Sequence, residues 1–206
     1  LPKLLVCSQA AANAVMLGCG YFNPLTGFMD LADALSTSEK MTTGCGLFFP
    51  VPIVNVVEDA AGIAGARRIA LLDPNVDGNP VIAIQDVESI DTASEEQMQQ
   101  MGQQVFRTTD AEHPGLKNFL SVGKTFVAGP IQVLNHSYFA GDFPETFKTA
   151  VEIREMIQKN GWSKVVAFQT RNPMHRAHEA LVKIAMERTG ADGAVIHMLL
   201  GKLKEG

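Results

Sequence analysis

The first two thirds of the chain alternate between short apolar runs and turn signals. Residues 1–20 hold an apolar run and then an Ala-rich helical pattern that ends near Gly18 and Gly20. After a turn over residues 21–29, the spacing predicts a short helix over 30–35 and a longer one over 94–106, with Ser94 as its N-cap. Apolar runs of strand length predict four strands, over residues 47–57, 67–72, 80–90 and 126–134.

Proline and glycine mark bends in this part of the chain. Pro50 and Pro52 place the start of the 47–57 run at a sheet edge or a bend, because proline cannot donate a ladder hydrogen bond. Gly129-Pro130 interrupts the 126–134 run. Short strands with such corners are typical of barrel-like or α+β domains. We therefore expect a β-rich domain over residues 1–137.

From about residue 138 the pattern changes to helix, strand, helix and strand. Asp142 is the expected cap of the first helix, with Glu145 as its capping-box partner, and the helix should end at Asn160-Gly161. Strands are expected over 164–168 and 194–200. This order predicts a right-handed βαβ unit with parallel strands, and therefore an α/β domain over residues 138–206.

The second helix of this domain follows directly after the first strand. Asn172 is its expected N-cap and Pro173 its expected first residue. Its apolar residues recur at helical spacing and are expected to be buried: Ala177, Leu181, Ile184 and Ala185.

Composition is that of a soluble globular protein, with 46% hydrophobic and 19% charged residues and a net charge of −5. The acidic balance argues against general binding to nucleic acid or membrane surfaces, and no apolar run approaches the ~20 residues of a membrane span. Cys7, Cys19 and Cys45 show no CxxC spacing and fit a reducing cytoplasm. The start at Leu1 and the end directly after a strand-like run lead us to expect a piece of a longer protein.

Candidate chemistry gathers between the first strand and the second helix of the α/β domain. A helix N-terminus offers free N–H groups to an anion, and Arg171 adds a planar fork that matches two oxygens of sulfate or phosphate. Neutral donors come from Gln169, Thr170 and Asn172. His175 and His178 are three residues apart, so they share a helix face. Such positional and electrostatic groups suit phosphoryl or nucleotidyl transfer.

Other interpretations of these residues stay open. His175 and His178 could bind zinc in a hydrolase, although two ligands fall short of the three that a catalytic zinc site needs. They could also be ordinary surface histidines. His197, near the end of the last strand, either lines the site or is a core histidine. Lys202 either reaches a phosphate or is solvated.

The segment from Gln169 to Glu179 reads QTRNPMHRAHE and resembles the signature of the ATP sulfurylase (sulfate adenylyltransferase) family over its whole length. Three segments of the first domain are also similar to that family, namely YFNPLTGFM at 21–29, FPVPIV at 49–54 and VAGPIQ at 127–132.

The resemblance implies a PUA-like, β-barrel-type N-terminal domain followed by the start of a Rossmann-like nucleotidyltransferase domain. It implies that ATP, accompanied by Mg²⁺, reacts with sulfate to give adenylyl sulfate and pyrophosphate, in either direction. Arg171 and Gln169 would then hold sulfate, Thr170 and Asn172 would orient the reacting groups, and the two histidines would face the phosphates. Homo-oligomers are usual in the family. A PUA-like module that binds RNA is the alternative from another class.

Two departures from the family pattern are visible. The chain ends before the further nucleotide-binding motifs of the catalytic domain, so we expect it to be inactive alone. Where the family often has Pro after the histidine that corresponds to His197, this chain has Met198.

Overall fold

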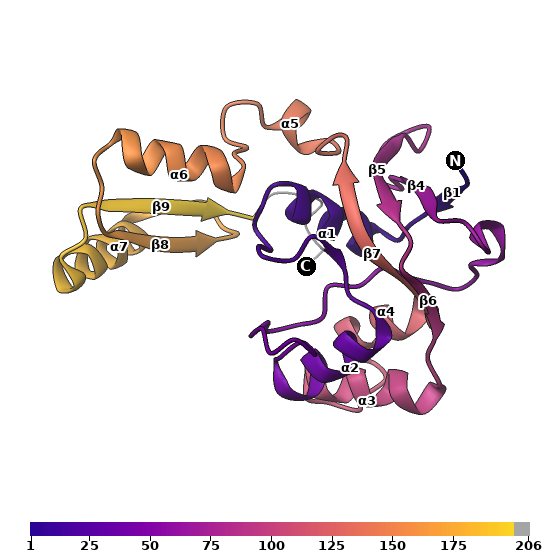
Figure 1. The fold of residues 1–206 in the computed structure, drawn as a ribbon. Helices are drawn as coiled ribbons and strands as arrows, with labels where there is room; N and C mark the ends of the chain where they lie inside the picture. The colour runs from indigo at the N-terminus through magenta and orange to yellow at the C-terminus, as the bar shows by residue number, and fades with distance from the viewer. Residues whose placement is uncertain (200–206) are drawn as a thin grey trace. The chain divides into compact units, whose positions relative to one another are not determined.

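A computed structural model describes residues 1–199 and divides the chain into two compact units, Leu1–Tyr138 and Phe139–Gly206 (Figure 1). The elements of the first unit are β1 (Lys3–Leu5), α1 (Ser8–Gly18), β2 (Gly27–Phe28), α2 (Leu31–Lys40), β3 (Val56–Val57), the 3-10 helix η1 (Ala61–Ile63), β4 (Arg68–Leu72), β5 (Val81–Asp86), β6 (Ser89–Thr92), α3 (Glu95–Phe106), α4 (Pro114–Ser121) and β7 (Thr125–Val133).

Strand β7 is the central strand of the sheet in the first unit. The sheet runs in the order β1-β4-β5-β7-β2, and β3 and β6 also pair with β7. All pairs of β7 are antiparallel, whereas β1 and β4 are parallel. Its residues from Thr125 to Ala128 are buried, as the apolar run predicts. One strand therefore connects the predicted strands of the first unit into a single mixed sheet.

Gly129 lets β7 change partners in mid-strand. Residues before it pair with β6 and β3, and residues from it onward pair with β2 and β5. The strand is continuous through Gly129, so the predicted interruption is a change of neighbours rather than a break. The φ of Gly129 is +130°, and a Cβ there would overlap the carbonyl oxygen of Asp86. Only glycine allows this close approach of two backbones.

Two buried amides tie the sheet together beneath β7. Gln85 is fully buried, and its Nε2 donates to the carbonyl oxygen of Val127 at 2.9 Å. Asn55 Nδ2 donates to Gln85 Oε1 at 3.3 Å. Because an unpaired buried amide is costly, these bonds fix which backbone segments lie next to one another.

A helical layer closes one side of the first unit, where α2, α3 and α4 lie together (Figure 1). Its core cluster includes Met98, Met101 and Phe126, all at most 2% exposed. The predicted helix over 94–106 is confirmed, with Ser94 as N-cap in a capping box with Gln97. Helix α4 was not predicted, because its eight residues span little more than two helical turns.

Three expectations for the first unit need correction. The 47–57 run is not a strand except at Val56–Val57, because its prolines cannot donate ladder bonds. The run over 80–90 forms two strands, since the chain bends at Val87-Glu88 and each part pairs with a different stretch of β7. Helix α2 continues to Lys40, five residues past its predicted end.

The second unit contains α5 (Phe139–Asp142), α6 (Ala150–Lys159), β8 (Val165–Thr170), α7 (Arg176–Thr189) and β9 (Gly193–Met198). Strands β8 and β9 are parallel and lie side by side, connected through α7 (Figure 1). The predicted βαβ order is therefore confirmed.

The predicted start of the first helix of this unit is wrong. Asp142 ends the short helix α5, and α6 begins only at Ala150. Thr149 is the actual N-cap, and its capping box uses Glu152 instead of Glu145. Both boxes satisfy the same sequence rule, but the first contains Pro144, which disfavours helical backbone at the residue before it.

The predicted burial of the α7 stripe is also wrong for the described residues. Leu181 is 54% exposed and Ile184 is 45% exposed, Ala177 is exposed and Ala185 is half-buried. Two strands about 4.8 Å apart are narrower than a helix of about 10 Å diameter, so they cover only part of its apolar face. Within residues 1–199, no helix combines the length and apolar character that crossing a membrane requires.

Replacing Gly129 with alanine should lower the free energy of unfolding by about 2–4 kcal/mol, because the new Cβ adds strain at positive φ and a clash with Asp86. Chemical denaturation followed by far-UV circular dichroism measures this. Gly62→Ala is the matched control, since a Cβ there meets no atom within 4 Å; its effect should stay within about 0.5 kcal/mol. Equal stability of the two variants would contradict the assigned role of Gly129.

Candidate functional site

The carboxyl ends of β8 and β9 bring most of the candidate residues to one edge of the second unit. The register pairs Gln169 with His197 and Thr170 with Met198. Strand β8 extends to Thr170, two residues past its predicted end, so Gln169 and Thr170 are strand residues. Strand β9 covers Gly193–Met198, and Lys202 lies outside the described residues.

The two faces of the strand pair carry different candidates. Phe168 faces α7, because its ring lies 5.4 Å from that of His178. Side chains alternate along a strand, so Gln169 and its register partner His197 share the opposite face. Both are exposed. The structure thus brings together Gln169 and His197 on one face, and the two histidines with Phe168 on the other.

Helix α7 begins at Arg176, and its N-cap is His175 rather than Asn172. The His175 Nδ1 accepts a hydrogen bond from the backbone N–H of Ala177 at 3.3 Å. Asn172 is instead held in a tight turn by Thr170, whose Oγ1 accepts from the Asn172 N–H at 3.1 Å and donates to its carbonyl oxygen at 2.9 Å. The chain therefore needs three more residues to reach the helix, and Pro173 is not in its first turn.

His175 and His178 form a ring pair at the start of α7. Their ring centroids are 3.9 Å apart with an interplanar angle of 30°. His178 is half-buried, and its Nδ1 is buried without a hydrogen-bond partner among the described residues. Both rings lie within the first turn of α7, next to the Asn172 turn. The pair therefore places two imidazole rings beside the carboxyl end of β8.

Arg171 lies between the anchored residues Thr170 and Asn172 and is exposed. Glu179 is also exposed and accepts a 2.6 Å hydrogen bond from Lys183 Nζ, which lowers the pKa of Glu179. That geometry is typical of a solvated helix residue. The edge therefore combines the exposed guanidinium of Arg171 with amide and imidazole groups, a set suited to oxyanions.

The opposite ends of the two strands are clamped by Asp192. Its carboxylate accepts from the Ser163 N–H and Oγ and from the Lys164 N–H, each at 2.9 Å. These backbone bonds lower the pKa of Asp192 to about 2. Gly193 follows directly, and a Cβ there would overlap the Trp162 ring that packs on it. Asp192 was not identified from the sequence. A usable signal was its position directly before β9, because parallel strands begin at the same edge and Asp192 therefore lies near the start of β8.

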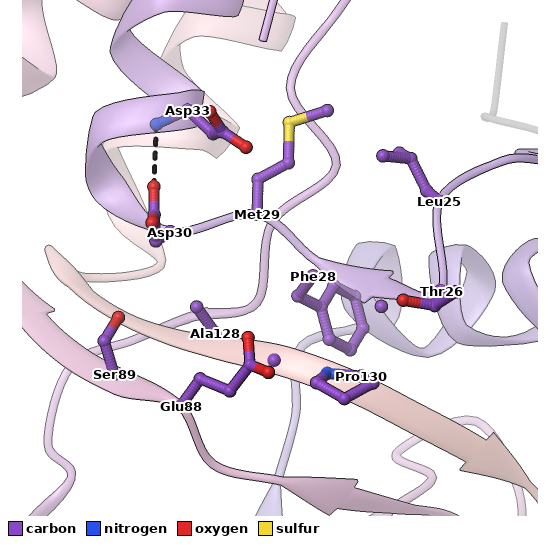
Figure 2. A pocket seen from close by; sticks show the side chains of 12 residues that line it. Leu25, Thr26, Phe28, Met29, Asp30, Asp33, Glu88, Ser89, Ala128 and Pro130 are labelled. Atoms are coloured by element: carbon purple, nitrogen blue, oxygen red, sulfur yellow. Dashed lines mark hydrogen bonds between the residues drawn. The ribbon is translucent and has the colours of Figure 1, made fainter. Parts of the chain in front are cut away.

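A separate pocket of about 330 Å³ lies in the first unit, along β2, the middle of β7 and the start of α2 (Figure 2). Its charged residues are Asp30, Asp33 and Glu88. Asp30 caps α2 through a 2.7 Å bond from the Asp33 N–H, and Asp33 accepts from Gly44 N at 2.6 Å. This acidic lining does not suit an anion, so the junction of the second unit remains the candidate site.

Comparisons with known proteins match both units. A family model described as PUA-like domain matches residues 1–136, and one described as ATP-sulfurylase matches residues 144–206. Proteins named sulfate adenylyltransferase are 63% identical in Allochromatium vinosum, 58% in Alcanivorax borkumensis and 55% in the Riftia pachyptila sulfur-oxidizing endosymbiont. Each match covers 100% of this chain and 52%, 51% and 47% of the relative. The chain therefore spans about half the length of these relatives.

A solved structure, the hexameric APS kinase from Thiobacillus denitrificans, is similar in fold. It has a TM-score of 0.69 and 24% sequence identity, with 100% of this chain and 36% of that chain covered. At that identity the likeness shows the fold alone.

The hydrogen bonds that Asp192 accepts from Ser163 and Lys164 should make the stability of the second unit depend on pH. The folded pKa of Asp192 is about 2 and lies below the ordinary value of 3.8, so its contribution is present above pH 3.8 and is lost as the pH falls through about 2. Asp192→Asn should therefore destabilise the protein at pH 6, and the difference from the parent should shrink as the pH falls below 3.8 and vanish below about 2. Amide exchange at Ser163 and Lys164 across this range measures the effect. Asp77→Asn, at an exposed turn of the first unit, is the control. A difference that does not change with pH would contradict this role.

Proposed function

We propose that the chain belongs to the ATP-sulfurylase family, whose model matches residues 144–206, and that the complete protein is a sulfate adenylyltransferase, a transferase of sulfur metabolism. It joins ATP and sulfate into adenylyl sulfate and pyrophosphate, or runs the reverse reaction. The observation that carries this proposal is the junction itself. Gln169, Arg171 and the histidine pair all lie at the carboxyl edge of β8 and β9, with Gln169 and the histidines on opposite faces, and ligands of open parallel sheets bind at that edge.

Sulfate is the anion that Arg171 and Gln169 hold in this proposal. The guanidinium offers two parallel N–H donors, which match two oxygens of a tetrahedral oxyanion. The Gln169 amide adds a neutral donor from the strand end. His197 is exposed, pairs with Gln169 in register and lies on the same face of the strand pair. Together these groups fix one sulfate oxygen for attack.

The reaction forms a bond between that sulfate oxygen and the α-phosphorus of ATP. The bond from the α-phosphorus to the oxygen that bridges to the β-phosphorus breaks in line, and pyrophosphate leaves with that oxygen. Thr170 and Asn172 orient the reacting groups, and His175 and His178 stabilise the charge that develops on the leaving group. Catalysis by position and electrostatics needs no protein nucleophile.

Magnesium enters this proposal as part of the substrate, since ATP reacts as its Mg²⁺ complex. The junction offers amides, a guanidinium and imidazoles, whereas Mg²⁺ prefers carboxylate and phosphate oxygens. The nucleotide phosphates therefore hold the ion. It neutralises phosphate charge while Arg171 and the histidines bind the remaining oxygens.

The finer features of the family also belong to this proposal. We expect β8, α7 and β9 to open a Rossmann-like nucleotidyltransferase domain, and the complete protein to form a homo-oligomer. Cys7, Cys19 and Cys45 form no disulfide in the described part of the chain, which fits the reducing cytoplasm.

Replacing Arg171 with alanine in the complete protein should lower kcat/KM on the order of 100-fold, because the charged donor to the oxyanion is lost. The measurement is release of pyrophosphate from ATP in the presence of molybdate, which takes the place of sulfate. The kcat/KM of Arg171→Lys should lie between those of the parent and of Arg171→Ala, since lysine keeps the charge without the planar fork.

Arg188→Ala is the matched control for this experiment. Arg188 is in the last turn of α7, about 20 Å along the helix from its start, so its loss should leave the rate unchanged. The proposed function would be wrong if the parent protein released no pyrophosphate under these conditions. A parent-like rate in Arg171→Ala would refute the role of that residue.

His175 should have two separable roles, capping α7 and facing the leaving group. Asparagine is a strong N-cap but lacks the imidazole ring. His175→Asn should therefore keep the parent melting temperature and lower kcat by about 100-fold. His175→Ala should lose both, with stability reduced by about 1 kcal/mol. Thermal unfolding and the pyrophosphate assay, run on both variants, separate the roles, and full activity of His175→Asn would rule out the catalytic one.

A further inference from the structure

Thr170 differs from the other candidates at the junction because it is buried. It is 8% exposed, whereas Gln169, Arg171 and Asn172 are all exposed. A side chain in that position has little direct access to a ligand at the edge.

The hydroxyl of Thr170 is also fully engaged within the protein. Its single proton goes to the carbonyl oxygen of Asn172 at 2.9 Å, and its oxygen accepts from the Asn172 N–H at 3.1 Å. A threonine hydroxyl has one donor, so the proton is not available to an oxyanion while the turn persists. The two bonds close a tight turn around Arg171.

The backbone of Thr170 is held from the other side. Its carbonyl oxygen accepts from the Leu199 N–H at 2.9 Å, just beyond the end of β9. Thr170 therefore connects the ends of both strands to the turn. Arg171 lies between a residue fixed to the sheet and a residue fixed by the hydroxyl, so the direction in which its side chain leaves the backbone is set.

We propose that Thr170 is a positioning residue, which acts on the reaction by aiming Arg171 and does not contact the substrate. This inference rests on the proposed function, because it assigns Arg171 as the oxyanion-binding group. A guanidinium that is held in the productive direction loses less orientational freedom when the anion binds. Without the turn, Arg171 would still be present but would sample many directions.

The test compares Thr170→Val with Thr170→Ser in the complete protein. Valine has the same shape and favours strands, but it cannot form either bond to Asn172. Serine keeps the hydroxyl and loses only the methyl group. Thr170→Val should lower kcat/KM in the molybdate assay by roughly ten-fold, in line with the loss of two local hydrogen bonds, and Thr170→Ser should stay near the parent rate.

A double-mutant cycle separates positioning from direct contact. If Thr170 acts through Arg171, Thr170→Val should have little further effect in a protein that already carries Arg171→Ala. If Thr170 contacted the substrate itself, the two losses would multiply. Multiplied losses would overturn the proposal.

Amide exchange at Asn172 provides a readout that does not depend on activity. The Asn172 N–H should exchange about ten-fold faster in Thr170→Val and at the parent rate in Thr170→Ser, because only the former loses its acceptor. Parent-like exchange in Thr170→Val would overturn the proposal even if activity fell. An inactive parent would refute the proposed function, while the exchange rates would still decide whether Thr170 holds the turn.

Discussion

The parallel pairing of β8 with β9 is the constraint on which the candidate site depends. Parallel strands cannot be joined by a hairpin, so the chain must cross over through a helix before it returns. That crossover places the start of α7 at the carboxyl end of β8, beside the end of β9. Hydrogen bonds close both ends of the pair, through Asp192 at the start and through Leu199 and Thr170 at the finish. The candidate site lies at the carboxyl end of this pair.

The first unit is organised by a different constraint, which is the close approach of backbones around β7. A strand with partners on both sides along its length must lack a side chain wherever another backbone comes too near. Gly129 lacks a side chain next to the carbonyl oxygen of Asp86, and Gly27 lacks one next to the carbonyl oxygen of Gly129. The buried bond from Gln85 to Val127 reinforces the same strand. The acidic pocket of this unit follows from these contacts and takes no part in the proposed chemistry.

Periodicity allowed the sequence to predict the elements whose boundaries are set by burial, such as β7, α3 and the βαβ order. It failed where side chains bond to nearby backbone. Asn172 and Asp142 both look like helix caps, but the Thr170 hydroxyl holds Asn172 in a turn. The actual caps are His175 for α7 and Thr149 for α6. The types and order of the site residues were readable from Gln169 to His178. The face on which each lies, and the engagement of Thr170, depend on strand register and hydrogen bonds that no spacing rule encodes.

The cap of α7 has a consequence for the hydrogen atoms of His175. Because its Nδ1 accepts from the Ala177 N–H, that nitrogen carries a lone pair, and the ring proton of the neutral imidazole resides on Nε2. The tautomer is thus chosen by the backbone of the helix rather than by a neighbouring carboxylate. Formation of the first turn of α7 and placement of the ring proton on Nε2 are therefore coupled, and a chain with α7 unwound would lose this preference together with the helix.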